Sequence, residues 1–258
     1  MRATVAVLMA LTASLAACGD DSGGGRDGDS PRTAARGDHR AGALGGSAGT
    51  QALARTRLAE RPPGELAWVA DEARLSPGRT IAHRHELSFV YARRGPHSLR
   101  SGGGEASLGD GAAAAVEANV RHRHEAGGEG STFWEIRLAP PGSPPPPGFR
   151  AARRVFDSEP LEGIPAPADA AFIEVTVPPR GGRTTVHTHP GPEFIYQLSG
   201  RIDYQNAIIG TRRLGPGGAE GIPPGTPVQK RNPFARPASF LSLFLVDPDR
   251  PFAPKARF

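Results

Sequence analysis

The sequence contains a single cysteine, Cys18, so the chain cannot form an internal disulfide bond. Lysine is almost as scarce, because only 2 of the 31 basic residues are lysines and the other 29 are arginines. The sequence also lacks a nucleophile elbow, a phosphate-binding loop and a paired Ser/His/Asp arrangement. These absences argue against hydrolases of the serine type and against nucleotide-binding enzymes.

The positive charge of the chain does not indicate a nucleic-acid partner. The formal net charge is +5 and the sequence pI is about 10.1. The arginines are scattered, however, and there is no basic run with interleaved aromatic residues and no helix-turn-helix or zinc-finger spacing. We therefore interpret the arginines as a solvated surface and expect no binding to nucleic acid.

The first eighteen residues have the pattern of a targeting segment. Arg2 supplies a positive start, and the apolar run 5–11 that follows is too short to span a bilayer. The sequence Leu-Ala-Ala-Cys at 15–18 resembles a bacterial lipobox, in which cleavage precedes the cysteine. The resemblance implies a signal peptide over 1–17, a lipid on Cys18, and a mature protein anchored to the cell membrane on its extracytoplasmic face.

Residues 18–62 have the composition of a flexible tether. Gly, Ser, Asp, Arg and Ala dominate this stretch, and few large apolar residues are available to build a packed core. Residues 52–60 could add a turn or two of helix, which Pro62 and Pro63 would end.

Two histidines and a glutamate form the most informative pattern of the chain. His187 and His189 are two residues apart, so a β-strand would direct both imidazoles to the same face. Glu193 follows a Pro-Gly-Pro turn and starts the returning strand. Two histidines and one carboxylate with open positions suit a divalent metal ion.

This stretch resembles the first motif of the cupin superfamily, Gly-x5-His-x-His-x3,4-Glu-x6-Gly. Gly182 lies five residues before His187, and Gly200 closes the motif seven residues after Glu193. The resemblance implies an all-β fold, a double-stranded β-helix barrel of the jelly-roll type with the histidines at its mouth. It also allows a homodimer, because cupins often dimerise through strand exchange.

The motif occurs twice. His83 and His85 precede His187 and His189 by 104 residues, and the flanking glycines and aromatic residues recur with them. Such a long period indicates a duplicated domain. We therefore predict two tandem barrels, a bicupin, with the N-terminal barrel at 63–139, a stiff proline-rich linker at 140–150 and the C-terminal barrel at 151–258.

The two copies depart from the cupin pattern in different ways. The second cupin motif should supply a third histidine, which the resemblance places at His122 in the N-terminal copy and at Val228 in the C-terminal copy. Conversely, Ser88 stands where the glutamate of the first motif belongs in the N-terminal copy. The predicted metal ligands are His83, His85 and His122 in one barrel, and His187, His189 and Glu193 in the other. The metal could be Fe, Mn, Zn, Ni or Cu.

Other candidates carry weaker expectations. His124 shares a face with His122 and is either an additional ligand or part of the barrel mouth, whereas Glu86 should point away from its neighbour His85. Most of the remaining candidates are expected to be structural. They are Tyr91 and Tyr196 as cross-strand aromatics, Trp68 and Trp134 as core, and Arg79, Arg183, Gln229 and Arg231 as surface residues that could instead pair with an anion.

Two classes of function fit these residues. The first is a membrane-anchored binding protein that holds a divalent metal and a small-molecule ligand in its barrels. The alternative is a metal-dependent enzyme, a dioxygenase- or quercetinase-like bicupin or an isomerase, in which the metal binds dioxygen or polarises a substrate. The catalytic residues of such an enzyme are not identified by the sequence.

Overall fold

A computed structural model describes residues 44–258 of the chain, so the predicted signal peptide and Cys18 lie outside the described residues. Within this range the structure is all-β and contains no α-helix, hence no helix that could serve as a membrane span. The first half comprises β1 (Gly49–Leu58), β2 (Ala67–Leu75), β3 (Thr80–His83), β4 (Ser88–Arg94), β5 (His97–Ser101), β6 (Gly104–Leu108), β7 (Ala113–Val116), β8 (His122–Ala126) and β9 (Ser131–Ala139). The second half comprises β10 (Arg153–Asp157), β11 (Ala168–Val177), β12 (Gly182–Arg183), β13 (Glu193–Ser199), β14 (Ile202–Asn206), β15 (Gly210–Leu214), β16 (Ala219–Ile222), β17 (Val228–Asn232) and β18 (Ala238–Val246).

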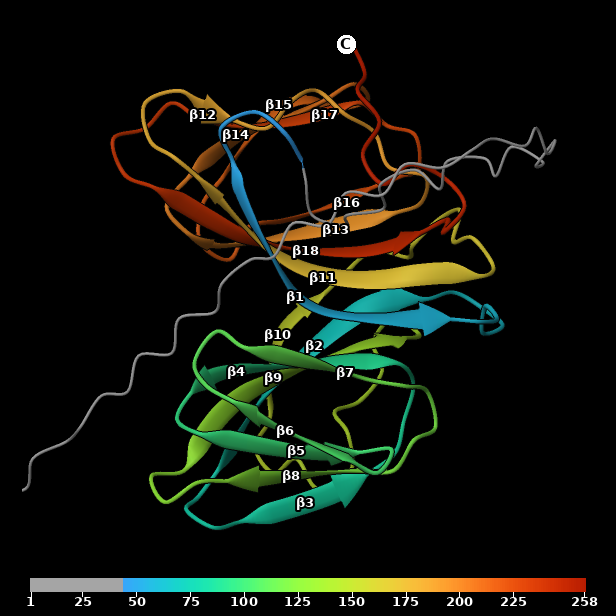
Figure 1. Cartoon of the computed structure of the whole chain (residues 1–258), viewed down its shortest axis with the longest axis vertical. Helices are drawn as coiled ribbons and strands as arrows, with labels where there is room; N and C mark the ends of the chain where they lie inside the picture. Colours follow the sequence, from blue (N-terminus) through green and yellow to red (C-terminus); the bar gives the residue numbers. More distant parts are fainter. Residues whose placement is uncertain (1–43) are drawn as a thin grey trace, which may run out of the picture. The chain divides into compact units, whose positions relative to one another are not determined.

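The strands form two barrels, each built from a five-stranded and a four-stranded antiparallel sheet (Figure 1). The N-terminal barrel combines the sheet β10-β2-β9-β4-β7 with the sheet β3-β8-β5-β6. The C-terminal barrel combines β1-β11-β18-β13-β16 with β12-β17-β14-β15. The predicted all-β fold with two tandem barrels is confirmed.

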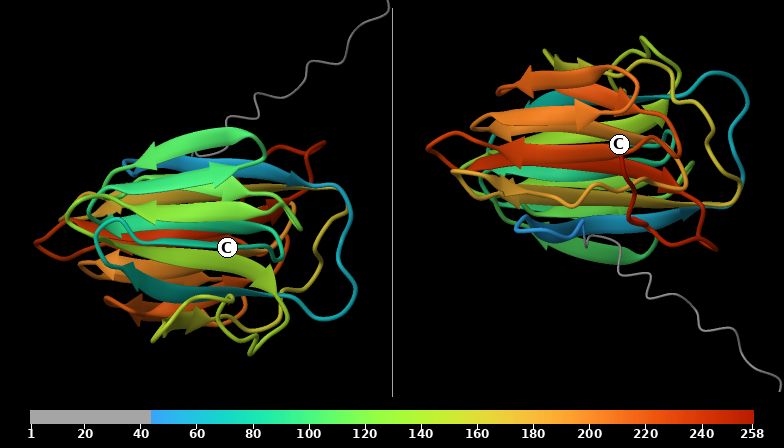
Figure 2. Two further views of the ribbon diagram at one scale, coloured as in Figure 1. Left: turned by 90° about the horizontal axis from the view of Figure 1, so that it is seen from below. Right: turned by 90° about the horizontal axis from the view of Figure 1, so that it is seen from above.

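The barrels exchange strands. β1 precedes the N-terminal barrel in sequence but pairs with β11 of the C-terminal barrel, from Gly49↔Thr176 to Leu58↔Ala168. β10 lies within the range predicted for the C-terminal barrel but pairs with β2 of the N-terminal barrel. Figure 2 shows β1 in blue at the edge of the C-terminal sheet, beside β11. The boundary predicted at residue 151 is therefore corrected, because β10 belongs to the first barrel.

The predictions for the segment before residue 63 also need correction. Residues 52–60 do not form a helix: β1 occupies Gly49–Leu58, and the described part of the predicted tether is mostly paired with β11. The composition of this segment suggested a flexible tether because it has few large apolar residues. An edge strand is held largely by backbone hydrogen bonds, however, and these do not require large apolar side chains. Leu44 and Leu58 are buried and anchor this segment at both ends.

The predicted proline-rich linker lies against the N-terminal barrel. The Arg137 guanidinium donates to the carbonyl of Pro144, and a ring nitrogen of His83 lies 3.1 Å from the carbonyl of Pro147. The ring of Phe149 packs on His83 and Phe133, with centroid distances of 5.4 and 5.5 Å. The segment thus covers the side of the barrel where the histidines lie.

The five-stranded sheets of the two barrels share one hydrophobic core. Phe89 of β4 stacks on Phe172 of β11 with ring centroids 5.4 Å apart, and Tyr91 meets the same Phe172 edge-on. Trp68 and Trp134 belong to this core, as predicted, and Tyr196 packs against Trp134 across the barrels. Burial of these aromatic faces from both sides joins the barrels into one packed unit.

Candidate metal centres in the two barrels

The N-terminal barrel gathers its three predicted histidines at one point. His83 at the end of β3 pairs across the sheet with His122 at the start of β8, and His85 follows in the loop after β3. Each of the three uses Nδ1 to donate a hydrogen bond to a backbone carbonyl, which fixes the tautomer and leaves Nε2 to face the interior. The acceptors are the carbonyls of Pro147, Glu86 and Val120, at 3.1, 2.7 and 3.1 Å from His83, His85 and His122, respectively.

A fourth residue, Glu135 of β9, completes this group. Its carboxylate lies 3.1 Å from Nε2 of His83, 2.7 Å from Nε2 of His85 and 3.0 Å from Nε2 of His122. The ligand atoms of these residues all lie within 4.8 Å of one another. Glu135 is fully buried and the three imidazoles are almost so. The sequence prediction had three imidazoles and no carboxylate here, and it missed Glu135.

The donor chemistry of this group fits a divalent metal ion. With Nδ1–H committed to carbonyls, each neutral imidazole presents a lone pair at Nε2, and these lone pairs point at an ionised carboxylate. Acceptors that face one another in a buried space require a cation or protons between them. Three imidazole nitrogens and one carboxylate oxygen are a ligand set that Zn, Fe or Mn accepts.

The surroundings of Glu135 favour its ionised form. Burial raises the pKa of the Glu135 carboxyl, but the charges and hydrogen bonds of the surrounding imidazoles outweigh burial and hold the pKa well below its ordinary value. Burial alone would lower the pKa of His85, but the hydrogen bond and charge of Glu135 outweigh it, and the net shift is upward. The carboxylate therefore stays ionised and available as a ligand at neutral pH.

Glu135 supplies the carboxylate that is missing at Ser88. In the N-terminal barrel Ser88 of β4 pairs with Arg137, and Glu135 lies two residues further along β9 on the same face. In the C-terminal barrel the corresponding positions of β13 and β18 hold Glu193 and Ser242. The serine hydroxyl approaches the glutamate in both barrels, at 3.5 Å from Ser88 and at 2.9 Å from Ser242.

The carboxylate and the serine have thus exchanged strands between the two copies. The signal that could have revealed this exchange is a glutamate flanked on both sides by apolar residues, at position 135 in the sequence Phe-Trp-Glu-Ile. When the last strand of each repeat is aligned, this glutamate falls opposite a serine of the second copy. Comparison of the first motifs alone could not reveal it.

Behind the N-terminal group lies a second line of imidazoles. His124 shares the inward face with His122, as predicted, and its Nε2 lies 3.6 Å from Glu135. Nδ1 of His124 is hydrogen-bonded to Nε2 of His97 at 3.0 Å, and Nδ1 of His97 contacts the hydroxyl of Ser131 at 3.0 Å. His124 falls outside the group of ligand atoms and is instead held by its neighbours in the barrel interior.

The C-terminal barrel brings together His187, His189 and Glu193, whose ligand atoms also lie within 4.8 Å of one another. Nδ1 of His187 donates to the carbonyl of Thr185 at 2.8 Å, and Nδ1 of His189 donates to that of Phe252 at 2.7 Å. Both Nε2 atoms are buried and have no hydrogen-bond partner among the described residues. The inward-facing tautomer of a metal ligand is therefore preserved in this barrel.

Two neighbours distinguish the C-terminal group from the N-terminal one. Val228 pairs with His187 in the way that His122 pairs with His83, so the third histidine is replaced by an apolar side chain. Lys230, two residues further along β17, is fully buried, and its Nζ lies 2.7 Å from Oε2 of Glu193. Sequence reasoning missed this lysine, although it is one of only two in the chain.

The charges in the C-terminal barrel follow from burial and from this pair. Burial lowers the pKa of His187 to about 3 and that of His189 to about 4, and the nearby ammonium of Lys230 acts in the same direction. Burial raises the pKa of Glu193, but the charge of Lys230 and the two imidazoles outweigh burial, so the net shift is downward. Both imidazoles are therefore neutral at physiological pH.

The remaining candidates behave as structural residues. Glu86 lies outside the ligand group, as predicted, with its carboxylate 3.7 Å from the Arg137 guanidinium. Arg79 and Arg183 are exposed. Gln229 donates its side-chain amide to the carbonyl of Thr184.

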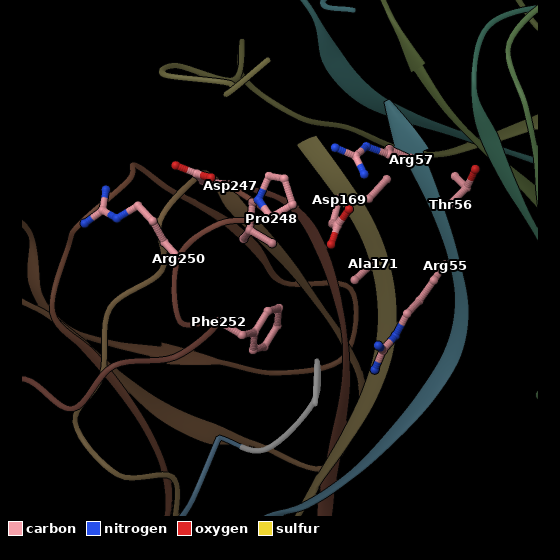
Figure 3. Close-up of a pocket in the computed structure, with 11 residues that line it drawn as sticks. Arg55, Thr56, Arg57, Asp169, Ala171, Asp247, Pro248, Arg250 and Phe252 are labelled. Carbon is pink, nitrogen blue, oxygen red and sulfur yellow. The ribbon is translucent and has the colours of Figure 1, made fainter. Parts of the chain in front are cut away.

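A surface pocket of about 250 Å³ lies beside the C-terminal group, between β1, β11, β18 and the loop after β18 (Figure 3). Its lining includes three arginines and two aspartates, which are Arg55, Arg57, Arg250, Asp169 and Asp247. Phe252 lies on its wall, and the ring of Phe252 packs on His189 with centroids 5.0 Å apart. Phe252 therefore contacts both the pocket and His189.

Residues 173–244, most of the C-terminal barrel, match the family model of the cupin domain. These residues form a cupin domain. Comparison of this cupin with curated proteins gave no significant match.

Solved structures of oxalate decarboxylases resemble this cupin. A variant of the Bacillus subtilis enzyme superposes with a TM-score of 0.52 at 18% identity, covering 77% of this chain and 78% of that chain. The Lactobacillus farciminis enzyme in complex with formate superposes with a TM-score of 0.55 at 15% identity, covering 78% and 88%. A further Bacillus subtilis structure, described for its Mn(II) centres, gives 0.52 at 17% identity and covers 80% of each chain. At these identities the likeness demonstrates a shared two-barrel fold.

Proposed function

We propose that this bicupin is a membrane-anchored binding protein whose N-terminal barrel holds a divalent transition metal at His83, His85, His122 and Glu135. The observation that carries the proposal is the set of three Nε2 lone pairs directed at one buried carboxylate. The Mn(II) centres named for the similarly folded oxalate decarboxylase favour the same class of ion. When bound, the metal would supply a fixed Lewis-acidic charge inside the barrel.

Closure of the site favours binding over turnover. Catalytic metal sites keep a coordination position open for water or substrate, whereas structural sites are enclosed. Here the segment around Pro147 and Phe149 lies directly on His83, and the imidazole side chains are at most 6% exposed. A substrate would have to displace this segment before it could reach the metal.

Metal content tests this proposal. The fragment of residues 44–258, purified without a histidine tag, is expected to retain about one divalent metal ion per chain, because a closed site releases its ion slowly. His83→Ala combined with His122→Ala should abolish this content, since only two of the four ligands remain. The matched control is His187→Ala combined with His189→Ala. Full metal content in the first double variant would refute the ligand assignment.

The alternative function is a metal-dependent enzyme. It is favoured by the fold shared with oxalate decarboxylases. The cupin-like motifs would also suit a dioxygenase- or quercetinase-like bicupin. The metal-loaded protein would be assayed for oxalate consumption and for dioxygen uptake with enolic or phenolic substrates. Turnover that is lost on chelation and in Glu135→Gln would establish the enzyme and displace the binding role.

The small-molecule ligand of the proposal is assigned to the surface pocket of Figure 3. The three arginines of the lining outnumber its two aspartates, and apolar side chains lie beside them. A small acidic molecule with an apolar part would suit such a lining. A panel of small carboxylates is expected to raise the melting temperature of the wild type, and Arg250→Ala should remove the effect. Arg183→Ala, an exposed arginine elsewhere on the same barrel, serves as the control. Equal effects in both variants would rule out this pocket.

The membrane anchor is a separate part of the proposal and rests on the lipobox-like sequence ending at Cys18. Cells grown with radiolabelled fatty acid should incorporate label into the wild-type protein and not into Cys18→Ser. Label retained in the variant would contradict the anchor without affecting the metal site.

A further inference from the structure

The C-terminal barrel contains its own cation. Lys230 extends from β17 into the barrel interior, is fully buried, and places Nζ 2.7 Å from Oε2 of Glu193. The second oxygen of Glu193 accepts a hydrogen bond from the hydroxyl of Ser242 at 2.9 Å. Both oxygens of the only carboxylate in the group are therefore engaged by neighbouring side chains.

The ammonium engages a carboxylate oxygen that a metal would need. A metal bound to a carboxylate oxygen lies about 2.0–2.2 Å from it. The Lys230 nitrogen already lies 2.7 Å from Oε2 of Glu193, the same oxygen that lies 3.5 Å from Nε2 of His189. A divalent ion bound there would meet a second positive charge with little water to screen it, which opposes binding.

Comparison with the N-terminal barrel identifies the residue changes that oppose metal binding in the C-terminal barrel. β8 and β17 occupy equivalent places, because His122 pairs with His83 as Val228 pairs with His187. Two residues further on, the inward positions hold His124 in one barrel and Lys230 in the other. The C-terminal barrel has thus lost one neutral ligand and gained one fixed charge on a single strand.

A lysine compensates the buried carboxylate in the C-terminal barrel but not in the N-terminal barrel. In the N-terminal barrel the carboxylate of Glu135 faces imidazoles, which can be neutral. No lysine lies in that barrel, because both lysines of the chain follow residue 228. A bound cation, or a proton held between the carboxylate and an imidazole, is needed there to compensate the carboxylate. Glu193 is already compensated by Lys230, so the C-terminal interior is neutral without a metal.

We propose that the ammonium of Lys230 replaces the metal ion in the C-terminal barrel, so that this bicupin carries one metal per chain, in the N-terminal barrel alone. The count of one rests on the proposed function, whereas the exclusion of metal from the C-terminal barrel stands on Lys230 and Val228 themselves. Experiments on each barrel can therefore fail independently.

Titration with Co²⁺ tests the inference, because Co²⁺ reports both stoichiometry by calorimetry and ligand type by its visible spectrum. Chelated wild-type protein should take up about one equivalent, and His187→Ala with His189→Ala should leave this uptake unchanged. Two equivalents in the wild type, or loss of the single equivalent in that double variant, would overturn the inference.

Removal of the ammonium provides the positive test. Lys230→Met keeps the length of the side chain and frees Glu193, and Val228→His restores the missing imidazole. The double variant should bind one equivalent more than the wild type, with a second set of visible bands. Adding Glu193→Gln to it should abolish the gain, and circular dichroism of this triple variant reports whether the substituted barrel folds.

The two proposals fail in different ways. If the wild type binds no Co²⁺, the function proposed for the N-terminal barrel is wrong, and the gain in Lys230→Met with Val228→His still decides the role of the lysine. If that folded double variant gains nothing, the lysine is not what excludes the metal and the inference is refuted.

Discussion

At the scale of single residues, the two barrels differ by an exchange between two neighbouring strands. Ser88 and Glu135 in the first barrel correspond to Glu193 and Ser242 in the second. The carboxylate enters the same interior from the adjacent strand, because residues diagonal to one another on one face of an antiparallel pair lie within reach of a long side chain. The barrel therefore preserves the position of the charge while its sequence position changes.

This exchange predicts that moving the carboxylate from position 135 to position 88 restores metal binding. Glu135→Ser should weaken metal binding about 100-fold, because loss of an outer-shell partner alone costs about 10–100-fold. Adding Ser88→Glu should recover much of the affinity, since it recreates the strand assignment of the C-terminal barrel. Competition with a chromophoric chelator measures both affinities. Ser107→Glu, on a different strand, is the control, and equal rescue by this control would contradict the argument.

A second prediction at the residue scale concerns His97 and the pH dependence of the free energy of unfolding. Burial lowers the pKa of His97 to about 4, from an ordinary value of 6.5. Below pH 6.5 the unfolded chain binds a proton that the folded chain does not, so the free energy of unfolding falls as pH decreases towards 4. Between about pH 7 and about pH 5 the contribution of His97 is about 2 kcal/mol.

Urea unfolding of the chelated protein across this range measures the fall in stability. His97→Phe should lose less stability on acidification than the wild type does, even if its stability at neutral pH is lower because the contacts with His124 and Ser131 are gone. Equal losses in both proteins would show that His97 is already charged in the folded state.

At the scale of elements, the strand exchange decides where the folded chain begins. β1 covers the edge of β11 and buries Leu58, although its composition resembles a linker. An uncovered β11 edge would expose a row of backbone donors and acceptors, which favours aggregation. A fragment that starts near residue 60, as the sequence alone suggests, would therefore lack part of the second barrel.

Truncation tests this reasoning. A fragment of residues 61–258 should be less stable than one of residues 44–258 by about 3 kcal/mol or more, because burial of a single leucine side chain already contributes about 1.5–3 kcal/mol. Urea midpoints and light scattering compare the two fragments. Identical midpoints would mean that β1 contributes nothing to the C-terminal barrel.

At the scale of the whole described unit, the exchanged strands and the shared aromatic core join the two barrels. Phe172 of the C-terminal barrel lies against Phe89 and Tyr91 of the N-terminal barrel. Phe240 belongs to a separate core inside the C-terminal barrel. Both tryptophans of the chain, Trp68 and Trp134, lie on N-terminal strands, so tryptophan fluorescence reports on that barrel.

We expect the two barrels to unfold in one cooperative transition. Phe240→Ala should cost about 3–5 kcal/mol and should shift the tryptophan transition together with the circular dichroism transition, although it touches only the C-terminal core. Phe172→Ala, at the junction, should act in the same way. A tryptophan transition left in place by Phe240→Ala would show that the barrels unfold separately.

The sequence by itself determined the two-barrel cupin fold and the histidines of both groups. These features follow from local sequence. His83 and His85, like His187 and His189, are separated by a single residue and so stay close in space, and a repeat of the motif requires a repeat of the domain. Pairing between distant strands follows no such local rule. Only the tertiary structure brought Glu135 to the first group and Lys230 to the second. It also gave β1 and β10 to the opposite barrels, since the contacts that hold them depend on strands far away in the chain.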